Sequence, residues 1–128
     1  MFLGTGLKNL GNTCYVNSTL QVLYGLDQSL KLFGDNSDSK SPEPLHESFL
    51  DTLKSLKKKQ DSFSPLDFIM KLRNKLPIYA EKDKYGLYIQ HDVHEFWSTL
   101  ISYLGKNDPN ITKNTNIILE KKYHILLL

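Results

Sequence analysis

The segment from Gln90 to Gly105, QHDVHEFWSTLISYLG, carries the strongest periodic pattern in the chain and most constrains its fold. Apolar side chains recur there at helical spacing, at Val93, Phe96, Trp97, Leu100, Ile101 and Leu104. Residues three and four apart share one face of a helix, so this face must be buried against other elements. Asp92 is placed to cap this helix, Glu95 to complete a capping box, and Gly105 to end it.

The same kind of pattern predicts three further helices, over residues 14–32, 45–58 and 65–75. Asn12 or Thr13 can supply the N-cap oxygen of the first of these helices. That start places Cys14 in the first helical turn.

The start of the helix over residues 65–75 has its own signals, because Ser64 suits an N-cap and Pro65 the first helical position. Pro77 disfavours continuation beyond the helix. Residues 78–89 are predicted to form a loop with some extended structure, and residues 117–128 read as strand-like. The predicted fold class is therefore mainly α, with a possible short strand segment at the C-terminus.

The composition favours a globular protein and argues against nucleic-acid-binding and membrane proteins. A length of 128 residues fits one domain or part of one, and 40% hydrophobic with 23% charged residues is typical of a globular protein. Fifteen of the sixteen basic residues are lysines, whereas nucleic-acid readout favours arginine, so no nucleic-acid partner is expected. Neither a signal peptide nor a membrane-spanning stretch is recognisable, which predicts an intracellular protein of the cytoplasm or nucleus without membrane association.

Cys14 is the only cysteine in the chain. It can form neither an internal disulfide nor a thiolate zinc site, and no metal or cofactor is expected. At the start of a helix, the macrodipole and unpaired backbone N–H groups favour a thiolate, and the same N–H groups can stabilise an oxyanion. Asn9 lies close enough in sequence to add a side-chain donor. The alternative is that Cys14 is a small buried hydrophobic residue, which is common for free cysteine.

Two motifs resemble those of the ubiquitin-specific proteases, which are papain-like deubiquitinating enzymes. Residues 6–24, GLKNLGNTCYVNSTLQVLY, are similar to the cysteine box of that family, and residues 90–104, beginning QHDVHEF, to its second box. The resemblance implies that residues 1–128 form part of a catalytic domain, namely the helical thumb lobe of a papain-like α+β cysteine protease. It also implies hydrolysis of isopeptide or peptide bonds after the ubiquitin C-terminus, with ubiquitin and ubiquitinated proteins as partners.

The resemblance also assigns roles to matching positions. Cys14 would be the nucleophile and Asn9 the oxyanion-hole residue. Gln90, Asp92 and Glu95 would border the cleft for the ubiquitin tail, where carboxylates can pair with arginines. Capping of the helix alone remains an alternative for Asp92 and Glu95. Three further cysteine-box positions are interpreted as helix-packing and loop-fixing residues, at Asn17, Ser18 and Gln21.

Some family features have no counterpart here. The family requires a histidine in a Gly-His-Tyr segment, and none of the four histidines fits that pattern, at His46, His91, His94 and His124. The family's paired Cys-x-x-Cys zinc ligands are also missing. We therefore expect a truncated chain whose second lobe is supplied in cis or in trans. The alternatives are a non-catalytic fragment that binds ubiquitin or acts as a scaffold, and a helical interaction module unrelated to ubiquitin.

Overall fold

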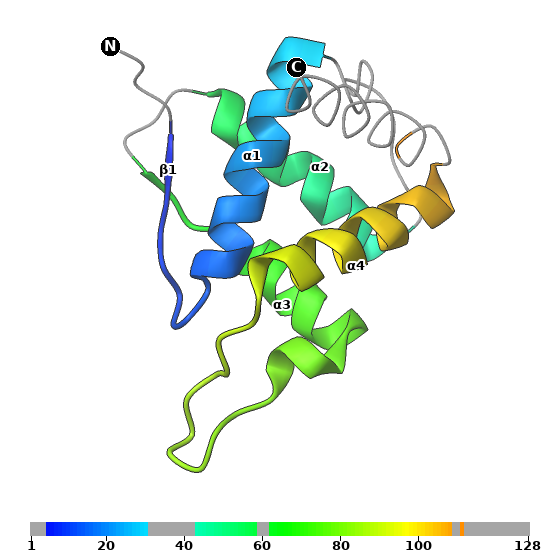
Figure 1. Ribbon diagram of the computed structural model, residues 1–128. Helices are drawn as coiled ribbons and strands as arrows, with labels where there is room; N and C mark the ends of the chain where they lie inside the picture. Colours follow the sequence, from blue (N-terminus) through cyan, green and yellow to red (C-terminus); the bar gives the residue numbers. More distant parts are fainter. Residues whose placement is uncertain (1–4, 31–42, 59–61, 109–110, 112–128) are drawn as a thin grey trace, which may run out of the picture.

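The computed structural model describes residues 5–30, 43–58, 62–108 and 111. Within these ranges the chain is mainly helical, which confirms the predicted fold class (Figure 1). The elements follow in the order β1 (Gly6–Leu7), α1 (Cys14–Leu30), α2 (Pro44–Lys57), β2 (Ser62–Phe63), α3 (Leu66–Lys75), the 3-10 helix η1 (Pro77–Ala80) and α4 (Val93–Asn107). The predicted strand over residues 117–128 lies outside the described residues.

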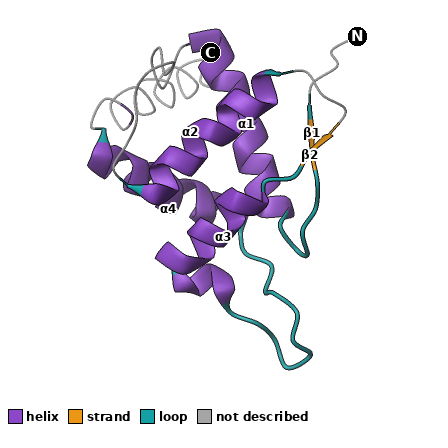
Figure 2. Ribbon diagram, turned by 180° about the vertical axis from the view of Figure 1, so that it is seen from behind, coloured by secondary structure: helices purple, strands orange, loops and turns teal. Residues whose placement is uncertain are grey.

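The core forms where α1, α2, α3 and α4 bring their apolar faces together (Figure 2). On α4, the predicted face is buried at Phe96, Leu100 and Leu104, each of which is at most 1% exposed. Val93 is an exception, because it is 48% exposed in the first turn of the helix. The apolar face of α4 therefore begins at Phe96 rather than at the first residue of the helix.

Strand β1, just before the turn that leads to Cys14, forms a short parallel pair with β2. Gly6 pairs with Ser62 and Leu7 with Phe63, and the Lys8 N–H donates to the Phe63 carbonyl at 2.9 Å. Because these strands are only two residues long, other contacts must help to hold them.

Side chains of α1 provide such contacts along the segment before the turn. Gln21 Nε2 donates to the Thr5 carbonyl at 2.8 Å, and Asn17 Nδ2 donates to the Lys8 carbonyl at 3.1 Å. The loop-fixing role predicted for Asn17 and Gln21 is confirmed.

Two predicted helix boundaries were wrong. Pro65 occupies the N-cap position of α3 without a side-chain cap, so Ser64 does not cap this helix. Helix α4 continues through Gly105 to Asn107, and the Asp108 N–H donates to the Leu104 carbonyl. Glycine ends a helix only where the chain turns away, and here the buried Leu104 side chain keeps the last turn packed on the core.

Residues 81–89 form a hairpin-like loop that extends from the helical body towards the start of α4 (Figure 1). Lys82 and Tyr88 form an isolated antiparallel bridge, and Gly86 adopts a φ of 78°, which the tight turn requires. The prediction of a loop with some extended structure over residues 78–89 is confirmed for residues 81–89. It was wrong for residues 78–80, which belong to the 3-10 helix η1. No helix in the described ranges is long and apolar enough to cross a membrane.

Candidate active site

The turn before Cys14 is organised by the side chain of Asn9. Its Oδ1 accepts hydrogen bonds from the Gly11 N–H at 3.1 Å, the Thr13 N–H at 3.3 Å and the Thr13 hydroxyl at 3.2 Å. Gly11 and Asn12 have φ values of 91° and 52°, so the chain takes two consecutive left-handed steps. The oxygen end of the Asn9 amide is therefore committed to the turn, and Nδ2 is the end that can donate to a ligand.

Thr13 holds the N-cap position of α1, because its carbonyl accepts from the Asn17 N–H at 2.9 Å, but its side chain does not supply the cap predicted for Asn12 or Thr13. Its buried hydroxyl accepts from the Leu10 N–H at 3.0 Å and donates to Asn9, so it closes the preceding turn and leaves the first helical N–H groups uncapped by its oxygen. Cys14 is the first residue of α1, as predicted, and its side chain is exposed. The alternative of a buried core cysteine is therefore wrong.

The two sequence motifs meet at the sulfur atom. Gln90 Nε2 donates a hydrogen bond to Cys14 Sγ at 2.8 Å, although the two residues are 76 positions apart in the sequence. A second link lies beside the first, because Asn12 Nδ2 donates to the Tyr88 carbonyl at 2.9 Å. The segment that leads into α4 is thus fastened to the turn that leads into α1.

The second motif also begins α4. Asp92 is the N-cap, and its Oδ1 accepts from the Glu95 N–H at 2.9 Å, so the predicted cap is confirmed. Within the described residues the Glu95 carboxylate does not return a hydrogen bond to Asp92, and only half of the predicted capping box is formed.

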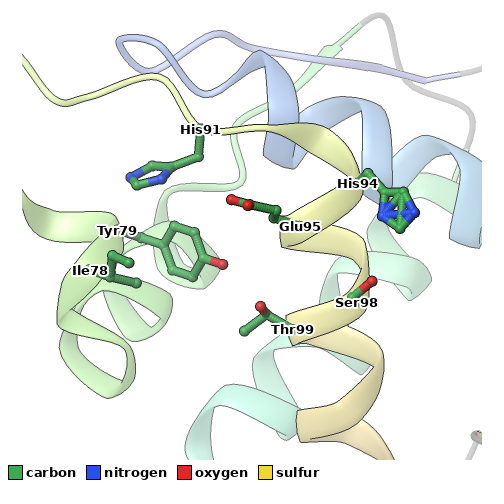
Figure 3. A pocket seen from close by; sticks show the side chains of 7 residues that line it. All are labelled: Ile78, Tyr79, His91, His94, Glu95, Ser98 and Thr99. Atoms are coloured by element: carbon green, nitrogen blue, oxygen red, sulfur yellow. The ribbon is translucent and has the colours of Figure 1, made fainter.

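Glu95 instead lines an open pocket of about 470 Å³ between η1 and α4. In Figure 3 its carboxylate points towards the side of the pocket that carries His91 and Tyr79. The lining residues are Ile78, Tyr79, His91, His94, Glu95, Ser98 and Thr99. An exposed carboxylate beside two aromatic rings is suited to a cationic group.

An aromatic cluster supports the segment between the two motifs. The His91 ring packs edge-on against Tyr15 at 5.5 Å and Tyr79 at 5.0 Å between ring centroids. Phe96 packs edge-on against the same two tyrosines at 5.3 and 5.2 Å. Burial raises the pKa of Tyr15, and the positive charge of Arg73 opposes part of that rise. This cluster was not predicted, although Tyr15 and His91, which lie within the two motifs, were the available signal.

The histidines have packing or surface roles within the described residues. His91 belongs to the aromatic cluster, His94 is exposed and lines the pocket, and His46 is buried on α2. Burial lowers the pKa of His46, although Asp108 and Glu43 oppose that shift. No hydrogen bond joins a histidine to Cys14 in these ranges, and His124 lies outside them.

The described residues contain no group of three or more histidine, cysteine, aspartate or glutamate side chains that could hold a metal ion. The groups of the site that can take part in a reaction or bind a ligand are the exposed thiol, its amide neighbours and the carboxylates of the second motif.

Comparison with known proteins identifies the family to which this chain belongs. The model of the family described as ubiquitin carboxyl-terminal hydrolase matches residues 5–122, a range that includes the whole candidate site. The chain belongs to this family. The ubiquitin-specific protease resemblance found in the sequence is thereby confirmed.

Two relatives illustrate how much of a ubiquitin carboxyl-terminal hydrolase the chain represents. It is 33% identical over 104 residues to ubiquitin carboxyl-terminal hydrolase 6 of Schizosaccharomyces pombe, with 80% of this chain and 21% of that protein covered. It is 29% identical over 109 residues to ubiquitin carboxyl-terminal hydrolase 6 of Arabidopsis thaliana, with 80% and 22% covered. The chain thus spans about a fifth of the length of these relatives.

Proposed function

We propose that this chain is the nucleophile-bearing part of a thiol-dependent deubiquitinase that cleaves isopeptide or peptide bonds after the ubiquitin C-terminus. Residues 1–128 would form part of the catalytic domain, acting on ubiquitin and ubiquitinated proteins inside the cell, in the cytoplasm or nucleus. The observation that carries this proposal is an exposed cysteine at a helix start that contacts the second motif, in a chain that belongs to the family.

The proposed reaction begins at Cys14. Its thiolate attacks the carbonyl carbon, the C–S bond forms, and the π electrons of the carbonyl move to oxygen. The Cys14 backbone N–H and Asn9 Nδ2 would donate hydrogen bonds to this oxyanion. The orientation of the Asn9 amide supports this role, because its oxygen is held by the turn and its nitrogen is left as the donor.

The tetrahedral adduct next collapses to a thioester as the C–N bond breaks, and water later hydrolyses this thioester to release the thiol. The leaving amine must gain a proton in the collapse. In the family a histidine supplies it, and the described residues offer no histidine hydrogen-bonded to the sulfur. We propose that a second lobe, in cis or in trans, provides this group. The 128 residues alone would then react with an electrophile once but turn over very slowly.

Gln90, Asp92 and Glu95 are proposed to contact the extended ubiquitin tail. Carboxylates can form charge-assisted pairs with arginines of that tail. The position of Glu95 in an open pocket with aromatic walls supports such a contact, since its carboxylate is not used for helix capping.

The test uses ubiquitin that carries a thiol-reactive group at its C-terminus. Intact-mass analysis should show one adduct on the wild-type chain and none on Cys14→Ala, because the chain has a single cysteine. The same reactive group on an unrelated carrier protein is the control for intrinsic thiol reactivity. Labelling no faster than with that carrier would refute the proposal. Binding of ubiquitin without an adduct would instead favour a non-catalytic ubiquitin-binding fragment.

A further inference from the structure

We propose that Gln90 is a positioning residue for the nucleophile, which holds the Cys14 sulfur in orientation before substrate arrives. This role differs from a contact with the substrate tail, and it rests on the proposed function in that Cys14 is the nucleophile. The observation behind it is the hydrogen bond from Gln90 Nε2 to Cys14 Sγ at 2.8 Å.

Burial does not force this contact, because both side chains are exposed. An exposed glutamine stays beside a sulfur only if its backbone is fixed there. Two neighbours provide that restraint. The Tyr88 carbonyl, two residues earlier, accepts from Asn12 Nδ2 at 2.9 Å, and the His91 ring, one residue later, packs against Tyr15 and Tyr79.

Tyr88 is itself restrained by cations on its ring. The Arg73 guanidinium of α3 lies 3.4 Å from the ring centroid, and Lys82 Nζ lies 4.8 Å from it. The Arg73 contact ties the end of the hairpin-like loop to the helical body. Gln90 is therefore restrained on both sides by its neighbours in the sequence.

Asn12 is suited to its part in this arrangement. It adopts a φ of 52°, a left-handed conformation that asparagine tolerates better than most residues. In this position its side chain reaches across to Tyr88 while the backbone turns into α1. The turn before the nucleophile thus serves two purposes, because it orients Asn9 and also anchors the segment that carries Gln90.

The hydrogen bond acts on the sulfur before the reaction. The Cys14 side chain can rotate among staggered rotamers, and a donor held at a fixed position favours the rotamer that it contacts. When the sulfur bonds to the carbonyl carbon, negative charge leaves it for the oxygen and the Gln90 hydrogen bond weakens. Gln90 exchanges no proton and forms no covalent bond. Its role is to limit the directions in which the sulfur can point.

A role confined to substrate contact makes a different prediction. A glutamine that touches only the ubiquitin tail would not alter the reaction of Cys14 with a small alkylating agent. A glutamine that holds the sulfur would alter that reaction in the absence of ubiquitin.

The experiment measures the rate of alkylation of Cys14 by iodoacetamide as a function of pH, by intact mass on the 128-residue chain. In Gln90→Ala the rate constant, compared with that of wild type at the same pH, should fall by about threefold, because the hydrogen bond that orients the sulfur is lost. Gln90→Glu removes the same amide donor and should slow the reaction at least as much. Circular dichroism of each variant checks that the fold is kept.

Two further variants test the mechanism. Gln28→Ala makes the same chemical change at an exposed position on α1 and should leave the alkylation rate constant unchanged. Asn12→Gly removes the link to Tyr88 while tolerating the left-handed backbone, and it should lower the rate constant as Gln90→Ala does. Equal rate constants for wild type, Gln90→Ala and Asn12→Gly would overturn the proposal, as would an equal fall in Gln28→Ala.

The outcome can be separated from that of the proposed function. Labelling by the ubiquitin reagent with an unchanged alkylation rate in Gln90→Ala would overturn only the positioning role. A lower alkylation rate in Gln90→Ala without labelling of wild type by the ubiquitin reagent would support the Gln90–Cys14 coupling and refute only the proposed activity.

Discussion

Asp92 is observed as a helix cap and is proposed as a carboxylate for the substrate tail, and substitutions can separate these roles. Its Oδ1 accepts from the Glu95 N–H at 2.9 Å. Asp92→Ala removes this acceptor and should destabilise the chain by about 1 kcal/mol. For a domain of this size that corresponds to a fall in Tm of roughly 4 °C.

Asp92→Asn retains an acceptor oxygen at the cap but loses the negative charge. Asp92 is exposed, so the lost interaction with the helix dipole should cost only about 0.3 kcal/mol. If the carboxylate also pairs with an arginine of the ubiquitin tail, labelling of Cys14 by the ubiquitin reagent should slow by about tenfold, the effect of losing one charge-assisted hydrogen bond. Asp92→Asn would then be nearly as stable as wild type but clearly slower to react.

The assays are thermal unfolding followed by circular dichroism and the labelling rate measured by intact mass. Asp51→Asn is the matched control, because it makes the same charge change at an exposed position on α2. An unchanged Tm in Asp92→Ala would refute the capping argument. A wild-type labelling rate in Asp92→Asn would leave Asp92 with capping as its only role.

Two further predictions concern the core and its pH dependence. Phe96→Ala should lower the free energy of unfolding by about 3–5 kcal/mol and sharply lower the urea midpoint, because Phe96 is 1% exposed and packs on two tyrosines. An effect no larger than that of Ser102→Ala, at an exposed position on α4, would contradict this prediction. His46 is 6% exposed, and burial lowers its pKa from 6.5. Its contribution to stability is therefore fully present above pH 6.5 and is lost as the pH falls through the lower pKa of the folded state. Wild type should therefore lose more thermal stability than His46→Gln between pH 7.5 and 5, and equal losses would show that His46 is not the responsible group.

Helix α4 shows which structure could be predicted from sequence. Its apolar spacing and its aspartate cap are local features, and both the helix and the cap appear where they were predicted. The cap depends only on Asp92 and an N–H three residues later. Such short-range hydrogen bonds are decided by neighbours in the sequence, so they can be recognised without tertiary information.

The wrong boundaries arose where tertiary packing outweighed local preference. Gly105 is a common helix terminator, but the chain stays helical because Leu104 is fully buried in the core. Ser64 is a favourable cap residue, but the carboxylate of Asp67 on α3 accepts a hydrogen bond from Ser48 of α2 at 2.6 Å, and the start of the helix is set by that packing. Neither contact can be read from the residues around the helix end.

The contact between Gln90 and Cys14 could not have been predicted for a related reason. The residues of each motif indicate its own chemistry, but the distance between the motifs depends on features outside them. These are the loop over residues 81–89, the Arg73 cation on Tyr88, and Tyr79, whose ring packs against aromatic residues of both motifs. In the sequence, Gln90 is an uncharged residue with no evident partner, and a role at the substrate was the natural interpretation. Once its amide nitrogen lies 2.8 Å from the sulfur, the second motif acts on the nucleophile as well. Substitutions in the loop that leave both motifs intact should therefore still change the reactivity of Cys14.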